Sequence, residues 1–149
     1  MREVFIRAVN SLVGTVEFLK VKVPDDVRIL PTAYGSDVTS YDRENYLVTY
    51  GESYHLLVGR DYALDMKVVI RPGLKSMSPG IKVEDMGTTY VGGHVARYFK
   101  GKKGLFDKKD ALVILYYCNV TNRTIKIEFK GKAKYDLMDI FDRVEVICH

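Results

Sequence analysis

Tryptophan and glutamine are absent from this chain of 149 residues, and asparagine occurs only four times. Charged residues, by contrast, make up 28% of the chain. Few thermolabile amides beside many charges are typical of thermophilic proteins, so the composition predicts a thermophilic source. Long apolar runs are missing as well. The longest, Ala111 to Tyr117, has the length of a strand and cannot cross a bilayer as a helix, so we expect no membrane association.

Recognisable catalytic and export signals are also missing. The chain has no Walker sequence, no dinucleotide fingerprint, no paired zinc knuckle and no His-Glu-x-x-His motif. We therefore predict no catalytic residue, no bound metal and no cofactor, and we favour a protein that is not an enzyme. The charged, alternating N-terminus lacks a signal-peptide core, which indicates a cytoplasmic protein. In that compartment the sequons at Asn119 and Asn122 are turn residues rather than glycan sites.

Cysteine occurs only twice, as Cys118 and Cys148, and Cys148 is followed directly by His149. Three interpretations are open: two packed thiols, a disulfide, or part of a metal or redox site. Two adjacent residues on a strand point to opposite sides, which weakens the metal interpretation of Cys148 and His149. We favour a structural role, in which the pair fastens the C-terminal segment to the rest of the fold.

Abundant Val, Ile and Thr in alternating patterns favour strands over helices. We expect strands at residues 3–9, 15–23, 46–50, 54–58, 64–71, 81–85, 90–99, 111–118 and 123–130, and a short returning strand at 144–148. Gly51-Glu52-Ser53 predicts a hairpin between the runs 46–50 and 54–58. The pair Gly92-Gly93 predicts a bulge or a close backbone approach, with a turn as the alternative.

The last third of the chain carries the clearest patterns. The continuously apolar run 111–118 predicts a strand that is covered on both faces. The run 123–130 predicts a half-buried antiparallel neighbour, with Lys126, Glu128 and Lys130 on its polar face. After it, an apolar stripe of helical spacing comprises Leu137, Ile140, Phe141 and Val144. Without a linker or repeat, we predict one domain, residues 1–149, of the α+β class: a central antiparallel β-sheet with a C-terminal helix packed on one face.

The net charge of +4 is unevenly distributed. Residues 97–134 hold eleven Lys or Arg against three Asp or Glu, a local net charge of +8 that leaves −4 for the rest. A solvated hairpin explains such a block without any partner, but a basic block on an acidic chain also suits an acidic protein surface. We prefer the solvated hairpin, because aromatic residues do not interleave with the cations. If the block does bind a partner, we expect an acidic protein surface rather than nucleic acid. The predicted contact residues are Lys102, Lys103, Lys108, Lys109, Arg123 and Lys126.

A small enzyme is the alternative hypothesis. His94 follows the glycine pair within an apolar run, and Tyr46, Tyr50 and Tyr54 gather near the expected hairpin. A pocket between them would give His94 a role as an acid or base. A structural histidine among packed aromatic side chains explains the same residues, and we prefer this explanation because no nucleophile or carboxylate stands at a recognisable spacing from His94.

One family resemblance covers residues 80–149. It rests on the segment Gly93-His94-Val95-Ala96-Arg97-Tyr98, the lysine-rich connection, the strand 111–118, the turn Asn122-Arg123-Thr124, the second strand and the final helix that runs into 144–148. In this order the elements resemble the C-terminal half of the PsbP-like superfamily, and the cysteine pair looks like a trait of an archaeal subgroup of unknown function. The resemblance implies a small α+β domain with an adaptor or accessory role, such as an extrinsic subunit of a photosynthetic complex or a binder of a small GTPase. No partner-contact residue is carried over from it.

Overall fold

The structure is a computed structural model. It describes residues 2–10, 14–23, 28–31, 33–34, 37–41, 47–49, 53–59, 64–104, 109–131, 137–143 and 145–147. Side chains are described in 65–104 and 109–131, and at Leu137, Met138, Phe141 and Asp142 of the helix.

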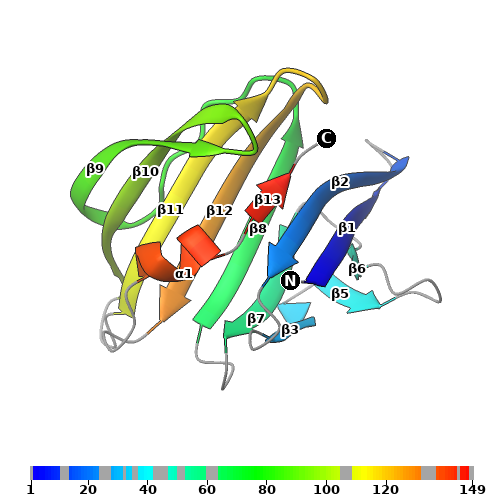
Figure 1. The fold of residues 1–149 in the computed structure, drawn as a ribbon, viewed down its shortest axis with the longest axis horizontal. Helices are drawn as coiled ribbons and strands as arrows, with labels where there is room; N and C mark the ends of the chain where they lie inside the picture. The colour runs from blue at the N-terminus through cyan, green and yellow to red at the C-terminus, as the bar shows by residue number, and fades with distance from the viewer. Residues whose placement is uncertain are drawn as a thin grey trace.

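Two sheets contain the described strands (Figure 1). The first has the order β13-β2-β1-β6-β5-β4. Its strands are β1 (Arg2–Asn10), β2 (Gly14–Val23), β4 (Ala33–Tyr34), β5 (Asp37–Tyr41), β6 (Leu47–Thr49) and β13 (Glu145–Ile147). The second has the order β3-β7-β8-β12-β11-β10-β9. Its strands are β3 (Arg28–Pro31), β7 (Ser53–Gly59), β8 (Leu64–Pro72), β9 (Lys82–Val91), β10 (His94–Lys103), β11 (Lys109–Cys118) and β12 (Arg123–Gly131).

The hairpin of β11 and β12 forms the centre of the second sheet and confirms the prediction for this region. Ile114 pairs with Ile127, and Leu112 pairs with Phe129, in an antiparallel register. Residues 111–116 of β11 are buried on both faces. Asn122 closes the turn with a φ of 52°, a left-handed conformation that asparagine tolerates better than most residues. Local alternation and turn chemistry were therefore sufficient to predict this pair of strands.

The chain between β8 and β9 crosses one face of the second sheet. These strands are consecutive in sequence, but β12, β11 and β10 lie between them. Neighbouring strands are about 4.8 Å apart, so the connection crosses about 19 Å of sheet. Because β8 and β9 run parallel, its nine residues must also cover distance along the strands, from the Pro72 end of the sheet to the Lys82 end. Residues 73–81, which we call the crossing loop, make this connection. Met77 and Ile81 of the loop pack against a buried cluster of Phe99, Val113 and Leu115.

The opposite face of the sheet packs against the helix α1 (Leu137–Arg143). Phe141 of the helix meets Phe129 of β12 edge to face, with ring centroids 6.2 Å apart. Side chains alternate across a strand, so the partners of Phe129 in register share its face. We call this the helix face, and the opposite side, under the crossing loop, the loop face.

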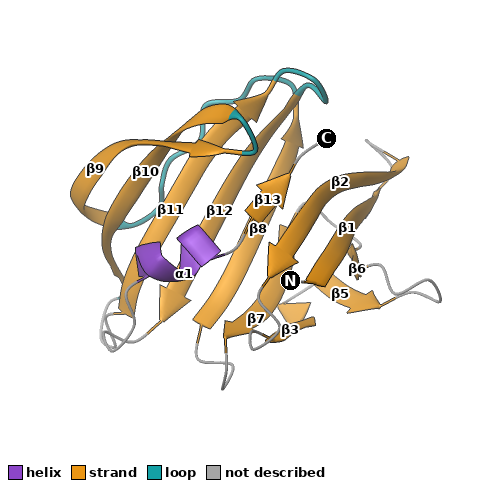
Figure 2. Ribbon diagram, viewed as in Figure 1, coloured by secondary structure: helices purple, strands orange, loops and turns teal. Residues whose placement is uncertain are grey.

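The predicted α+β class is wrong, because the fold is essentially all-β (Figure 2). Within the described residues α1 is the one helix, and its seven residues span about 10 Å. The apolar stripe predicted this helix, and the chain returns as the predicted short strand, β13, from Glu145 onward. A helix of this length lies against β11 and β12 and is too short to form a layer over seven strands. The single-domain prediction stays a prediction.

Two local predictions also need correction. The runs 46–50 and 54–58 do not form a hairpin, because β6 pairs with β1 and β5 while β7 pairs with β3 and β8. The Gly51-Glu52-Ser53 connection therefore lies between strands of different sheets. Gly92 and Gly93 form a turn, the predicted alternative, rather than the favoured bulge or close approach. They are the two central residues of a tight hairpin turn between β9 and β10, with φ values of 54° and 84°.

Candidate functional site

The structure divides the predicted contact residues between the two faces of the second sheet. Lys103 pairs in register with Lys109, and both lie on the loop face together with Lys126. Lys102 and Arg123 fall on the helix face by strand alternation. Lys108 lies outside the described residues.

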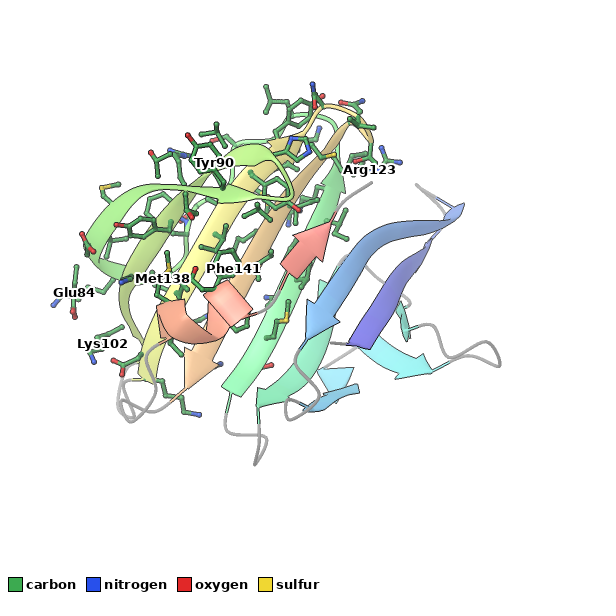
Figure 3. The ribbon with its side chains drawn as sticks, viewed as in Figure 1. Glu84, Tyr90, Lys102, Arg123, Met138 and Phe141 are labelled. Atoms are coloured by element: carbon green, nitrogen blue, oxygen red, sulfur yellow. The ribbon has the colours of Figure 1, made fainter. Side chains whose placement is uncertain are left out.

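Lys102 and Arg123 also lie at opposite ends of the sheet (Figure 3). Their partners in register on β11 are Asp110 and Cys118, about 27 Å apart along the strand. Lys102 forms an ion pair with Asp110, and this hydrogen bond to the carboxylate raises the pKa of Lys102. The guanidinium of Arg123 donates to the carbonyl oxygens of Thr121 and Asn122, each at 3.0 Å. These two cations therefore serve local structure rather than a shared surface.

A different set of cations shares the loop face. Register pairs Lys67 with Glu128, Arg71 with Thr124, and Lys130 with Asp65, which places all of these side chains on one side of β8 and β12. We call this set the basic face: Lys67, Arg71, Lys103, Lys109, Lys126 and Lys130. Among the described residues of β8, β12, β11 and the end of β10, the carboxylates on this side are Asp65 and Glu128.

Glu128 lies at the centre of the basic face and is 4% exposed, although the alternation predicted it on the polar, solvent-facing side of its strand. Its Oε1 accepts a hydrogen bond from Nζ of Lys103 at 2.7 Å. The side chain of Lys103 extends over the sheet surface to reach Glu128. The residues on this side between them, Gly101 and Ala111, are too small to block it. The buried carboxylate therefore organises the surrounding lysines, with Lys67 directly opposite it on β8.

Lys126 connects the basic face to the crossing loop. Its Nζ donates to the carbonyl oxygen of Ser78 at 3.1 Å. Burial beneath the loop lowers the pKa of Lys126, because desolvation disfavours its charged form. The nearby Glu128 carboxylate opposes this shift, while the positive charges of Lys67, Lys103 and Arg71 add to it. These three cations are thus close enough to Lys126 to act on it electrostatically.

A cavity of about 230 Å³ lies on the loop face between the crossing loop and β10. Its lining comprises Leu74, Lys75, Met77, Val95, Ala96, Arg97, Leu115, Tyr116, Tyr117 and Thr124. Thr124 fixes the loop beside it, because its hydroxyl donates to the carbonyl of Gly73 at 2.7 Å and accepts from the backbone N–H of Lys75 at 2.8 Å. A second cavity of about 180 Å³ lies at the other end of the sheet, between α1 and the ends of β10 and β11.

The alternative pocket near His94 is described only in part. His94 stacks on Tyr116, with ring centroids 5.8 Å apart, and Tyr116 contributes to the wall of the larger cavity. The side chains of Tyr46, Tyr50 and Tyr54 lie outside the described ones. The enzyme hypothesis therefore stays a hypothesis.

The cysteine hypotheses are also open. Cys118 is buried at the end of β11, while Cys148 and His149 lie outside the described residues. In the part of the chain that the structure describes, no three His, Cys, Asp or Glu side chains gather in a way that could hold a metal ion.

Sequence reasoning missed Lys67, Arg71 and the crossing loop. Both cations precede the basic block of the sequence, so a count of local charge did not include them. The missing information was that β8 pairs with β12, although their paired residues are between 51 (Pro72 and Arg123) and 67 (Leu64 and Gly131) positions apart in the sequence. The alternation within 65–71, with Lys67 and Arg71 on one side, was the signal that could have placed them on a polar face.

No protein-family model and no curated protein matches the chain. Among solved structures, a match covers 98% of this chain and 91% of LpqN, described as involved in cell envelope biogenesis of Mycobacterium tuberculosis. The identity is 11% and the TM-score is 0.45, a similarity that supports no argument about fold or function. The PsbP-like resemblance, the thermophilic source and the cytoplasmic location thus stay predictions. No helix among the described residues is long and apolar enough to cross a membrane.

Proposed function

We propose that this protein is a binding module without catalytic activity, and that its basic face holds an acidic surface of a partner protein. The observation that carries the proposal is the gathering of six cations around two carboxylates on the described part of one sheet face. These cations come from four strands, and β8, which carries Lys67 and Arg71, is distant in sequence from the other three. Opposite charge on a partner would steer its encounter and set its orientation.

The rigid support of the basic face favours recognition of a protein surface. Lys103 is held by Glu128, and Lys126 is held by the backbone of the crossing loop. Cations fixed in this way lose less conformational freedom on binding than lysines on a flexible tail. Nucleic acid is the weaker alternative, because on this side of the described strands β8 and β12 the cations do not alternate with aromatic side chains on which bases could stack.

A peptide-binding assay tests the proposal. We expect a fluorescein-labelled peptide of Glu and Asp to bind the protein, and its fluorescence anisotropy to fall as salt rises from about 50 to about 500 mM, because salt screens exposed charges. The double variant Lys67→Gln/Lys126→Gln should weaken binding about fivefold to tenfold, as expected for the loss of two steering charges.

The matched control is the double variant Lys82→Gln/Lys102→Gln. It removes the same number of charges, and its residues pair with each other on the helix face. We expect it to bind like the unaltered protein. Equal losses in both double variants would show that net charge rather than the basic face drives binding. Tighter binding of a single-stranded oligonucleotide than of the acidic peptide would replace the proposal by nucleic-acid recognition.

A further inference from the structure

The larger cavity has apolar walls and two basic residues in its lining. Leu74, Met77 and Leu115 contribute apolar surface, while Lys75 and Arg97 contribute the cations. The guanidinium of Arg97 lies 5.5 Å from the ring centroid of Phe99, which holds it over the sheet surface. A site of this kind suits a bulky apolar group that has negative charge beside it.

Exposed apolar side chains continue the cavity onto the surface. Val95 is 63% exposed, and its partner in register, Tyr90, is 72% exposed (Figure 3). Leu74 is also largely exposed on the other side of the cavity. Single exposed apolar residues need no explanation, but here three of them adjoin or line one hollow.

The cavity is small. Pockets for drug-sized ligands and cofactors usually measure about 300–1,000 Å³, and this one measures about 230 Å³. A single large side chain fits this space better than a cofactor does. Interfaces often take most of their binding energy from one aromatic side chain that fills such a pocket.

The cavity is continuous with the basic face. Thr124 lines the cavity and pairs in register with Arg71, and Lys126 follows two residues later on the same side of β12. We propose that the cavity is the anchor site of the acidic partner, and that it takes one bulky apolar side chain of an acidic segment whose carboxylates meet Lys75, Arg97 and the basic face. This inference rests on the proposed function and adds the identity of the recognised segment.

The absence of tryptophan from the chain makes the anchor directly observable. The probe is a short peptide of Glu and Asp with one central Trp, compared with the same peptide carrying Ala instead. We expect the Trp peptide to bind at least about tenfold more tightly, with its emission shifted to the blue as the indole leaves water. A Trp peptide with Gln in place of the acids should bind more weakly than the acidic one.

A matched pair of variants locates the anchor on the protein. Val95→Asp places a negative charge at the cavity wall, whereas Val120→Asp makes the same change at an equally exposed valine, 63% in both cases, that does not line the cavity. We expect Val95→Asp to abolish the blue shift and Val120→Asp to preserve it. The comparison of the three peptides on the unaltered protein needs no variant, so it stays decisive if Val95→Asp fails to fold.

The possible failures are distinguishable. Equal affinity for the Trp and Ala peptides, without a blue shift, would overturn the anchor and leave the proposed function standing. Equal binding of the acidic and Gln-based Trp peptides would show an apolar site that does not require charge, and would also overturn the inference. If none of the acidic peptides bound, the proposed function would fall, and the anchor with it.

Discussion

At the scale of single residues, Glu128 is a carboxylate buried among lysines. Its hydrogen bond with Lys103 has one buried partner and one partner that is 35% exposed. Such a pair contributes little net stability by itself, but the loss of one partner leaves a buried charge poorly compensated. Glu128 is therefore best understood as the residue that fixes the spacing of the cations around it.

Replacement of Lys103 by Leu should lower the free energy of unfolding by about 2 kcal/mol, because the buried Glu128 carboxylate loses its hydrogen-bond donor. Urea denaturation measures this change. The double variant Lys103→Leu/Glu128→Leu should recover most of the loss, since neither charge is then buried. A double variant as unstable as Lys103→Leu would contradict this account of the pair.

Lys126 makes stability depend on pH in the alkaline range. Its pKa in the folded protein lies below the ordinary value of 10.5, chiefly because burial disfavours its charged form. The unfolded chain therefore holds this proton more tightly, and the contribution of Lys126 to stability rises as pH increases through the interval between the two pKa values. Below that interval both states are protonated and the contribution is constant.

The difference in unfolding free energy between the unaltered protein and Lys126→Met isolates this effect from the titration of other lysines. We expect the difference to shift in favour of the unaltered protein as pH rises toward 10.5, the ordinary lysine value. Urea denaturation at several pH values measures it. A difference that is independent of pH over this range would contradict a lowered pKa.

At the scale of elements, the turn between β9 and β10 depends on glycine at both central positions. Both residues have positive φ, and a side chain at Gly93 would meet no heavy atom within 4 Å. The cost of substitution at Gly93 is therefore conformational rather than steric. Asparagine followed by glycine is the preferred pair for such a turn.

We predict that Gly92→Asn leaves stability unchanged within about 0.5 kcal/mol, whereas Gly93→Val lowers it by about 1–2 kcal/mol. Thermal unfolding of both variants compares the two positions. Similar losses at Gly92 and Gly93 would show that the backbone there does not have the geometry described.

Elements whose pattern is local were predictable, and those set by distant contacts were not. The hairpin of β11 and β12 follows from apolar runs on either side of a four-residue turn. The separation of β6 and β7 into different sheets, by contrast, depends on their partners β1 and β8. The helix stripe and the returning strand at the C-terminal end were also predictable from local pattern, but one short helix among the described strands does not make an α+β fold.

At the scale of the whole molecule, the same distinction applies to the candidate site. Lys103, Lys109 and Lys126 were predicted from local charge, but the face they share with Lys67 and Arg71 exists only through the pairing of β8 with β12. A list of cations from the sequence also included Lys102 and Arg123, which lie on the other face. A count of charges along the sequence thus located the basic region of the chain, but it could not tell which of these side chains share one face of the sheet.

The crossing loop also has a consequence for the order of folding. Strands β9 to β12 follow one another through short turns, so this meander can form by local contacts. The pairing of β8 with β12 closes a much longer loop and carries a larger entropic cost. We therefore expect β8 to join the sheet after the meander has formed. The crossing loop would then settle over the loop face last, so that the basic face and its neighbouring cavity are completed in one late step.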